Sequence, residues 1–484
     1  MPSWSPLSSH RGSAPRCSSE TRIAVDCCRM SQALPHGVAE IPKADDARVE
    51  ALWSGLRAAG GLSVARLLQS ALTKDAQGGA ATAASHACWE KLHTGDWKDV
   101  AVAWRDAYSL ATLVQLNGGT KEPAGTEASM RALDVAALVG GPAFRDEVDR
   151  AIAALQTALD AQRPQKKRPR ANEGAPDALP LLGEPPEGGA PPLPPGSGVG
   201  GIARAELPPL ESFLTEHMTG EGVPLLITGL VDSWPAAQRW RDPAYLLHVA
   251  GARTVPVEVG EHYLAPSWRQ ELMPLARFLE AHLSSGGGAA GRGYLAQHAL
   301  FEQVPALRAD IVTPDYCSLG GGELQAVNAW LGPAGTVTPL HHDPHHNVLA
   351  QVVGAKYVRL YAPSNGAALY AIPSGHCTNS SRVDVAAPDH DAFPLFAAAH
   401  FVDVELQAGE VRQLCFLLAS TVRLLMHPWT GALHSARLVA LRAGAHILIL
   451  SLLLVGLSGL PSRQRDVTRE TARQDLLRSS VRLP

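Results

Sequence analysis

Cysteine is scarce in this chain, and no CxxC pair occurs. The 484 residues include seven cysteines, an odd number. This pattern argues against both a disulfide framework and a structural zinc site. The formal net charge of −4 gives no general case for nucleic-acid binding. The first residues lack the basic and then apolar pattern of a secretory signal, so we expect a soluble intracellular protein.

A segment long enough to cross a membrane is also lacking. The apolar run 447–460 is shorter than the ~20 residues that a bilayer span needs. Extending it upstream meets His446 and Arg442. We therefore expect no membrane anchor, and we interpret the run as fortuitous apolar sequence that is prone to aggregate.

Composition and periodicity divide the chain into five parts. Apolar residues at i, i+3, i+4 spacing, as in 49–56 and 64–68, predict a helical domain. Further helices are expected at 97–115, 128–139 and 144–159. Trp53, Trp89 and Trp104 are interpreted as core residues. The expected organisation is a disordered leader 1–44, a helical domain 45–161, a Pro/Gly-rich linker 162–206, a second domain 207–410 and an atypical tail 411–484.

The linker contains two short segments of interest. Residues 163–170, RPQKKRPR, form a basic cluster typical of nuclear-localisation signals, although such clusters also arise by chance in linkers. It favours a nuclear location, with the cytoplasm as a second one. Residues 191–195, PPLPP, could engage a partner that binds polyproline.

The segment 338–347, TPLHHDPHHN, is the most informative part of the chain. On a strand, residues two apart share a face, so His341 and Asp343 point together while His342 turns away. One imidazole and one carboxylate supply two thirds of the 2-His-1-carboxylate site that holds Fe(II) in non-haem oxygenases. A solvated cluster of histidines that binds metal adventitiously is the alternative.

A lysine stands on an apolar strand face a few residues further on. Alternation in 352–360, VVGAKYVRL, places Lys356 with Val352, Val358 and Leu360. Burying an unpaired ammonium is costly, so Lys356 needs an anion. A dicarboxylate cosubstrate would supply one. The alternative is a strand-end lysine whose amine remains in water.

Several ordered runs resemble the jumonji-C (JmjC) oxygenase family. Residues 88–97 resemble the helical region of JmjC proteins. The matching runs of the second domain are 253–260, 293–298, 314–320, 328–330, 339–344 and 356–361. The resemblance implies an α+β protein, with an N-terminal helical domain and a double-stranded β-helix of the jelly-roll or cupin type.

The resemblance also implies the ligands of the site. His341 and Asp343 match metal ligands, and the cofactors would be Fe(II), 2-oxoglutarate and O₂. Residues that match those holding 2-oxoglutarate are Tyr294, Thr338, Asn347 and Lys356. Glu258 and Trp330 match residues of the substrate pocket, where an acid and an aromatic ring suit a cationic side chain. Both residue types are also common in cores without any ligand.

The family pattern ends after Glu410. A second histidine ligand is expected roughly eighty residues after the first, to complete the facial triad. That distance leads to Ser420, and the leucine- and arginine-rich sequence around it does not resemble the family. We therefore expect a jelly roll that is incomplete at its C-terminal strands. The tail offers three other histidines in place of this ligand, but no strand pattern or spacing supports any of them: His427, His434 and His446.

A retained intron would explain the break. Val411 and Arg412 can be encoded by GTG-AGG, which reads as a splice donor. Sequencing the transcript across the Glu410 codon tests this hypothesis, and it fails if no spliced message encodes a Trp-His strand.

The sequence thus indicates an Fe(II)- and 2-oxoglutarate-dependent dioxygenase. Its partner would be a protein or peptide with arginine or methyl-lysine, such as a histone or another nuclear or ribosomal protein, and no direct nucleic-acid binding is expected. The reaction would be arginyl hydroxylation or N-methyl-lysine demethylation, and lack of the second histidine argues against activity of this chain itself. The alternatives are a non-catalytic 2-oxoglutarate-binding or protein-interaction module, and a short-lived isoform without function.

Overall fold

The computed structural model describes most of the chain between residues 40 and 454. The described ranges are 40–73, 79–95, 99–117, 125–162, 201–218, 223–283, 292–321, 324–333, 335–343, 346–375, 377–414, 419–424 and 446–454. The expected leader, the basic and proline-rich segments of the linker, His427 and His434 lie outside these ranges, so the expectations for them stay predictions. Within the described ranges, no helix combines the length and apolar character that crossing a bilayer requires.

The helical domain packs around one apolar core. Its helices are α2 (Ala47–Ala58), α3 (Leu62–Leu72), α4 (Gly79–Leu92), α5 (Val102–Asn117), α6 (Thr126–Val139) and α7 (Arg145–Gln162). Asp46 caps α2 by accepting a hydrogen bond from the backbone N–H of Arg48, a typical start signal. Trp53 and Trp104 are buried and Trp89 packs against the same core, so their interpretation as core residues is confirmed. The helices expected at 128–139 and 144–159 are confirmed as α6 and α7, and the one expected at 97–115 corresponds to α5, which begins only at Val102.

The second domain contains two sheets of mostly antiparallel strands. The larger sheet has the order β1-β2-β11-β8-β13-β6-β5-β3-β4, and the smaller has the order β10-β9-β12-β7. The strands are β1 (Ala203–Glu206), β2 (Leu225–Thr228), β3 (Thr254–Val259), β4 (Arg269–Pro274), β5 (Gly293–His298), β6 (Leu324–Pro333), β7 (Val337–His341), β8 (Asn347–Val353), β9 (Lys356–Tyr361), β10 (Phe401–Leu406), β11 (Val411–Leu414), β12 (Ala419–Leu424) and β13 (His446–Leu454). Every residue of β8 and β9 is buried, including the polar or charged Asn347, Gln351, Lys356 and Arg359.

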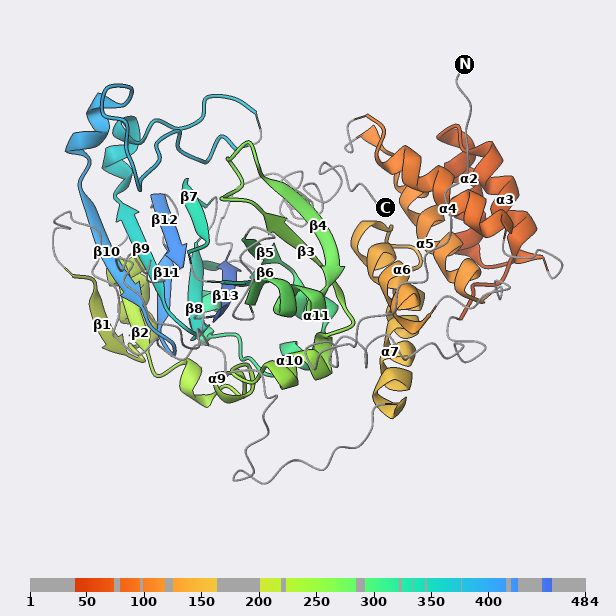
Figure 1. Ribbon diagram of the computed structural model, residues 1–484, viewed down its shortest axis with the longest axis horizontal. Coiled ribbons are helices and arrows are strands. Elements are labelled where there is room, and N and C mark those ends of the chain that lie inside the picture. The colour runs from red at the N-terminus through yellow and green to blue at the C-terminus, as the bar shows by residue number, and fades with distance from the viewer. Residues whose placement is uncertain are drawn as a thin grey trace, which may run out of the picture.

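Short helices connect the strands of this domain. They are α8 (Leu210–Ser212), α9 (Ala236–Arg239), α10 (Pro243–Ala250), α11 (Leu275–Phe278), α12 (Leu300–Gln303) and α13 (Pro305–Arg308). The helical domain lies beside β3 and β4, at one edge of the larger sheet (Figure 1). Ala252 and Leu272 of that edge pack against the helical core.

The tail after Glu410 supplies three strands, which corrects the expectation of an incomplete jelly roll. β11 pairs with β2 and β8, and β12 pairs with β7 and β9. β13 pairs with both β6 and β8, so it occupies an interior place of the larger sheet. The physical reason is that a run rich in leucine and isoleucine suits a strand flanked on both sides, where an apolar sequence has partners for all its backbone groups. The run read as fortuitous is thus a paired strand.

The turn between β8 and β9 corrects one assignment of faces. Val358 and Leu360 belong to the apolar cluster that includes Tyr294, whereas Val352 belongs to the main core on the other side of β8. Gly354 adopts φ of +80°, which only glycine adopts readily. The chain reverses there, so a single alternation does not run from Val352 to Lys356.

One arginine of the tail is fully buried. Arg412 of β11 has 0% exposure, and it pairs in register with Leu226 and Leu349, which both belong to the cluster around Tyr294. Directly opposed residues of an antiparallel pair share a face. A buried guanidinium therefore stands where the sheet presents leucines.

Candidate functional site

The two side chains predicted as metal ligands, which we call the metal-ligand pair, lie close together near the end of β7. Nε2 of His341 lies 3.7 Å from Oδ1 of Asp343. Nδ1 of His341 lies 2.8 Å from the carbonyl oxygen of Pro339 and must donate to it, since a carbonyl only accepts. This hydrogen bond fixes the tautomer that leaves the lone pair on Nε2, as in metal-binding histidines. The structure thus brings together the two residues that the strand pattern predicted as ligands.

The position opposite His341 is occupied by a residue that does not complete this site. β12 pairs with β7 in antiparallel register, with Ser420 opposite His341. This is the position to which the sequence spacing led for the second histidine. A serine hydroxyl is outside the histidine and carboxylate donor set of the facial triad. Within the described ranges, no three His, Cys, Asp or Glu side chains are arranged to hold a metal ion.

Three of the predicted cosubstrate residues converge in the interior between the two sheets. Lys356 is 2% exposed, and its Nζ lies 3.3 Å from the hydroxyl of Tyr294. Burial lowers the pKa of Lys356 to about 7. Tyr294 is also buried, which raises the pKa of its phenol, and its hydroxyl is hydrogen-bonded to the side chain of Thr338. A buried amine facing two neutral hydroxyls suits the carboxylate of a ligand.

Asn347 links this interior to the metal-ligand pair. Its Nδ2 donates to Oδ2 of Asp343 at 2.7 Å, which orients the carboxylate. Its buried Oδ1 has no hydrogen-bond partner among the described residues. Because a buried amide oxygen normally has a donor, this atom is available to a ligand or a water molecule.

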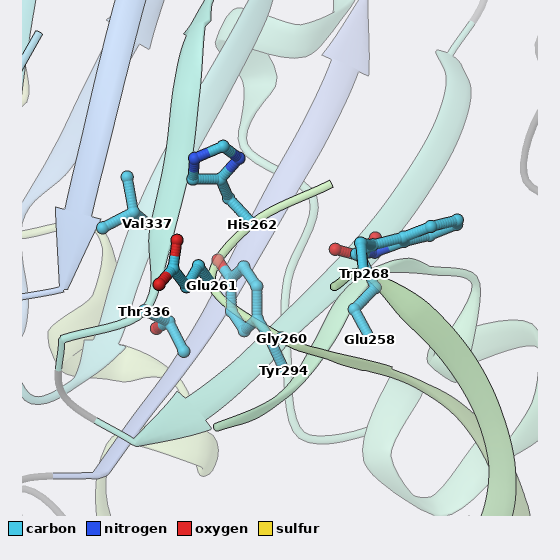
Figure 2. Close-up of a pocket in the computed structure, with 8 residues that line it drawn as sticks. All are labelled: Glu258, Gly260, Glu261, His262, Trp268, Tyr294, Thr336 and Val337. Atoms are coloured by element: carbon cyan, nitrogen blue, oxygen red, sulfur yellow. The ribbon is translucent and has the colours of Figure 1, made fainter. Parts of the chain in front are cut away.

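A pocket opens beside Tyr294. It is lined by Glu258, Gly260, Glu261, His262, Trp268, Tyr294, Thr336 and Val337. In Figure 2, Glu258 and Trp268 lie on one side of the Tyr294 ring, and Glu261, Thr336 and Val337 lie on the other. Two carboxylates, those of Glu258 and Glu261, stand at the walls of this pocket and favour a cationic group.

Of the two predicted pocket residues, one lines this pocket. Glu258 pairs in register with Tyr294 and so stands directly beside the cosubstrate residues. Trp330 of β6 is half-buried and packs against the cluster that includes Tyr294, without lining the pocket as described. Its role in substrate binding stays a prediction.

The sequence reasoning missed the residues of the β3–β4 loop. Glu261, His262 and Trp268 line the pocket, and the hydroxyl of Tyr263 lies 2.9 Å from that of Ser380. Burial raises the pKa of the Tyr263 phenol, and the charges of Glu258 and Asp343 raise it further. No spacing signals these residues. The family-like run that ends at Gly260 was the only pointer to the loop that follows it.

Comparisons with known proteins agree with this fold. Residues 210–412 match a family described as a cupin-like domain, and residues 42–169 match KDM8-like, N-terminal ARM repeats. Lysine-specific demethylase JMJ30 of Arabidopsis thaliana is 39% identical over 385 residues, which cover 76% of this chain and 87% of that protein. This chain belongs to the JmjC oxygenase family.

Two animal JmjC proteins are similar to this chain over comparable lengths. Lysine-specific demethylase 8 of Danio rerio is 37% identical over 335 residues, covering 67% of this chain and 79% of that protein. Jumonji C domain-containing protein 5 of Drosophila melanogaster is 37% identical over 330 residues, covering 66% and 78%. JmjC proteins are protein-modifying oxygenases that use Fe(II) and 2-oxoglutarate. The expected α+β class, with helical repeats before a cupin domain, is confirmed.

The described residues fit the two cofactors of JmjC proteins unequally. A dicarboxylate fits, because the buried amine of Lys356 lies beside the hydroxyl of Tyr294, which is bonded to Thr338, and forms no ion pair with a carboxylate of the described residues. Iron fits in part, because His341 and Asp343 present two ligand atoms and Ser420 takes the third position in register.

Proposed function

We propose that this chain binds 2-oxoglutarate between its two sheets and receives an arginine or N-methyl-lysine side chain of a protein in the adjoining pocket. The observation that supports this proposal is the buried amine of Lys356, which lies beside Tyr294 and its partner Thr338. One carboxylate of 2-oxoglutarate would pair with Lys356, and Asn347 would meet the other end of the ligand. His341 and Asp343 would hold Fe(II), which when bound supplies O₂ activation for oxidising a substrate C–H bond.

The residues that line the pocket favour a cationic substrate side chain. Glu258 lines the pocket, is only partly exposed and lies beside Tyr294, so it would accept hydrogen bonds from a guanidinium or methylammonium group. Trp268 would cover an aliphatic stem or contact the cation. The relatives named lysine-specific demethylases support a protein substrate, and a histone or another nuclear protein is the partner that we propose.

A nuclear location is part of the proposal. The basic cluster 163–170 is of the kind that directs nuclear import. Fluorescence microscopy of the full chain, with and without the lysines and arginines of this cluster, tests the location. An unchanged distribution would show that the cluster does not direct nuclear import.

The second candidate is binding without catalysis, and Ser420 favours it. With serine opposite His341, the described residues offer two iron ligands of three. Calorimetric titration of 2-oxoglutarate, followed by a mass-spectrometric test for succinate, separates the candidates. Binding with turnover supports an oxygenase, binding without turnover supports a binding module, and a folded chain that does not bind 2-oxoglutarate contradicts both.

We expect Glu258→Gln to weaken binding of an arginine-containing peptide by roughly tenfold, because a charge-assisted hydrogen bond becomes a neutral one. Affinity for 2-oxoglutarate should change little. Fluorescence anisotropy with a labelled basic peptide measures the change. Glu261→Gln is the matched control on the opposite wall, and its effect should be smaller because Glu261 is exposed to solvent. Equal losses for the two variants would indicate a diffuse electrostatic attraction instead of a defined pocket.

A further inference from the structure

A buried carboxylate of the helical domain reaches into the cupin domain. Asp134 of α6 has 0% exposure. Its Oδ1 accepts hydrogen bonds from Nε and Nη2 of Arg253, at 3.0 and 2.7 Å. Its Oδ2 accepts one from the backbone N–H of Thr254 at 2.6 Å. These donors lie 119 and 120 residues further along the chain, so the contact joins two separately formed units.

Gln303 extends this contact to a second strand. Its Nε2 donates to Oδ1 of Asp134 at 3.1 Å and to the carbonyl of Thr254 at 2.8 Å. Its Oε1 lies 2.7 Å from Nε2 of His298, which therefore donates to it. Burial lowers the pKa of His298 to about 4, so its ring is neutral at physiological pH. We call these five residues, Asp134, Arg253, Thr254, His298 and Gln303, the interdomain cluster.

The interdomain cluster holds the far ends of the two strands that form the pocket. Thr254 begins β3, which carries Glu258 four residues later, and His298 ends β5, which carries Tyr294. Glu258 and Tyr294 pair in register. A paired strand is a stiff element. Fixing one end of β3 and of β5 therefore also fixes the positions of Glu258 and Tyr294.

The end of β5 also stores backbone strain. Gln297 has φ of +48°, and the pairing of β5 with β6 shifts register between Leu295 and His298. A non-glycine residue in this region persists only when surrounding contacts hold it. The hydrogen bond from His298 to Gln303, at the end of this bulge, is such a contact.

We propose that Asp134 is a positioning residue, through which docking of the helical domain sets the geometry of the pocket and of Tyr294. Adhesion between the domains does not require this arrangement, because Ala252 and Leu272 already supply an apolar contact. A buried ion pair contributes little net stability compared with apolar residues of similar volume, but it accepts only one geometry. The helical domain thus holds β3 and β5, and with them the pocket, in one geometry. The ligand-affinity part of this proposal rests on the proposed 2-oxoglutarate site.

The test is Asp134→Asn in the full chain, followed by hydrogen exchange and by 2-oxoglutarate titration. Asparagine keeps the shape of the side chain but leaves the guanidinium of Arg253 without a counter-charge. We expect faster exchange of backbone amides in β3 and β5, with unchanged exchange in β8 and β9. We also expect affinity for 2-oxoglutarate to fall roughly tenfold, within the usual range of coupling between sites. Asp149→Asn removes an exposed ion pair of the same domain and should change neither.

A double variant keeps the test decisive if Asp134→Asn fails to fold. Asp134→Asn with Arg253→Gln removes both charges, so it should regain thermal stability while β3 and β5 remain less protected than in the parent chain. The proposal is overturned if the double variant restores full protection, or if exchange rises equally in all strands, since either result means a purely structural contact. It is also overturned if exchange and affinity stay at parent values in a folded variant. If the parent chain does not bind 2-oxoglutarate, the proposed function fails, and the exchange data still decide the role of Asp134.

Discussion

Replacing Ser420 by histidine should convert this chain into an iron-dependent oxygenase, with the affinity for Fe(II) rising by roughly a hundredfold or more. The register places position 420 opposite His341, so an introduced histidine would share the face of the existing ligand. His341 already presents Nε2 toward Asp343, and the hydrogen bond to Pro339 holds its ring. Two histidines and one carboxylate then form the facial triad.

Succinate formation from 2-oxoglutarate with added Fe(II) measures the gain. Thr421→His is the control, because it adds a histidine to the same strand at a position of opposite alternation, and it should stay inactive. Equal turnover by the parent chain and by Ser420→His would mean that another residue, such as His427, His434 or His446, already completes the site. A folded Ser420→His that binds iron and 2-oxoglutarate without turnover would favour the binding module.

Binding of 2-oxoglutarate should weaken as pH rises above 7, by about tenfold per pH unit, because the ammonium form of Lys356 is the one that pairs with a carboxylate. Burial lowers the pKa of Lys356 from 10.5 to about 7, so in the free protein the amine is mostly neutral at pH 8. A bound carboxylate favours the charged form, so binding at pH 8 takes up close to one proton. Below about pH 6 this group is already charged and the dependence should vanish.

Calorimetry in buffers of different ionisation enthalpy measures the proton uptake directly. Lys356→Met should weaken binding by roughly a hundredfold and abolish the uptake, because the charged partner of the carboxylate is lost. Lys91→Met, at an exposed position of α4, is the control and should leave both unchanged. Affinity that does not vary between pH 6 and 9 would mean that Lys356 does not contact the ligand.

The lowered pKa of Lys356 also affects the stability of the folded chain. Between about pH 7 and 10.5 the unfolded chain keeps the proton on Lys356 and the folded chain releases it, so this group makes the ligand-free protein more stable as pH rises through that window. The charge that the ligand needs is the one that folding disfavours, and this opposition is typical of binding sites.

Local patterns predicted those site residues that lie close together in sequence. Alternation paired His341 with Asp343, because the rule acts over two residues. Lys356 was identified by the cost of burying its charge, which does not depend on the rest of the fold. Periodicity found the helices for the same local reason.

Features made by distant segments left no such signal. Trp268 and Tyr263 reach the site because the β3–β4 loop folds over it, and loop residues carry no period. The contact of Asp134 with Arg253 spans 119 residues. Val352 was misplaced because the reversal at Gly354 interrupts the alternation. The strand 446–454 was misread because an apolar run has the same composition whether it pairs or aggregates.

The interior place of β13 determines when the cupin domain can finish folding. β6 and β8 contact each other through β13, and its partners in β6 precede it by more than a hundred residues. During synthesis the helical domain has every one of its helices well before β13 leaves the ribosome, whereas the larger sheet stays open until then. Closure therefore depends on long-range pairing, which is slow and leaves two strand edges exposed to other chains in the meantime.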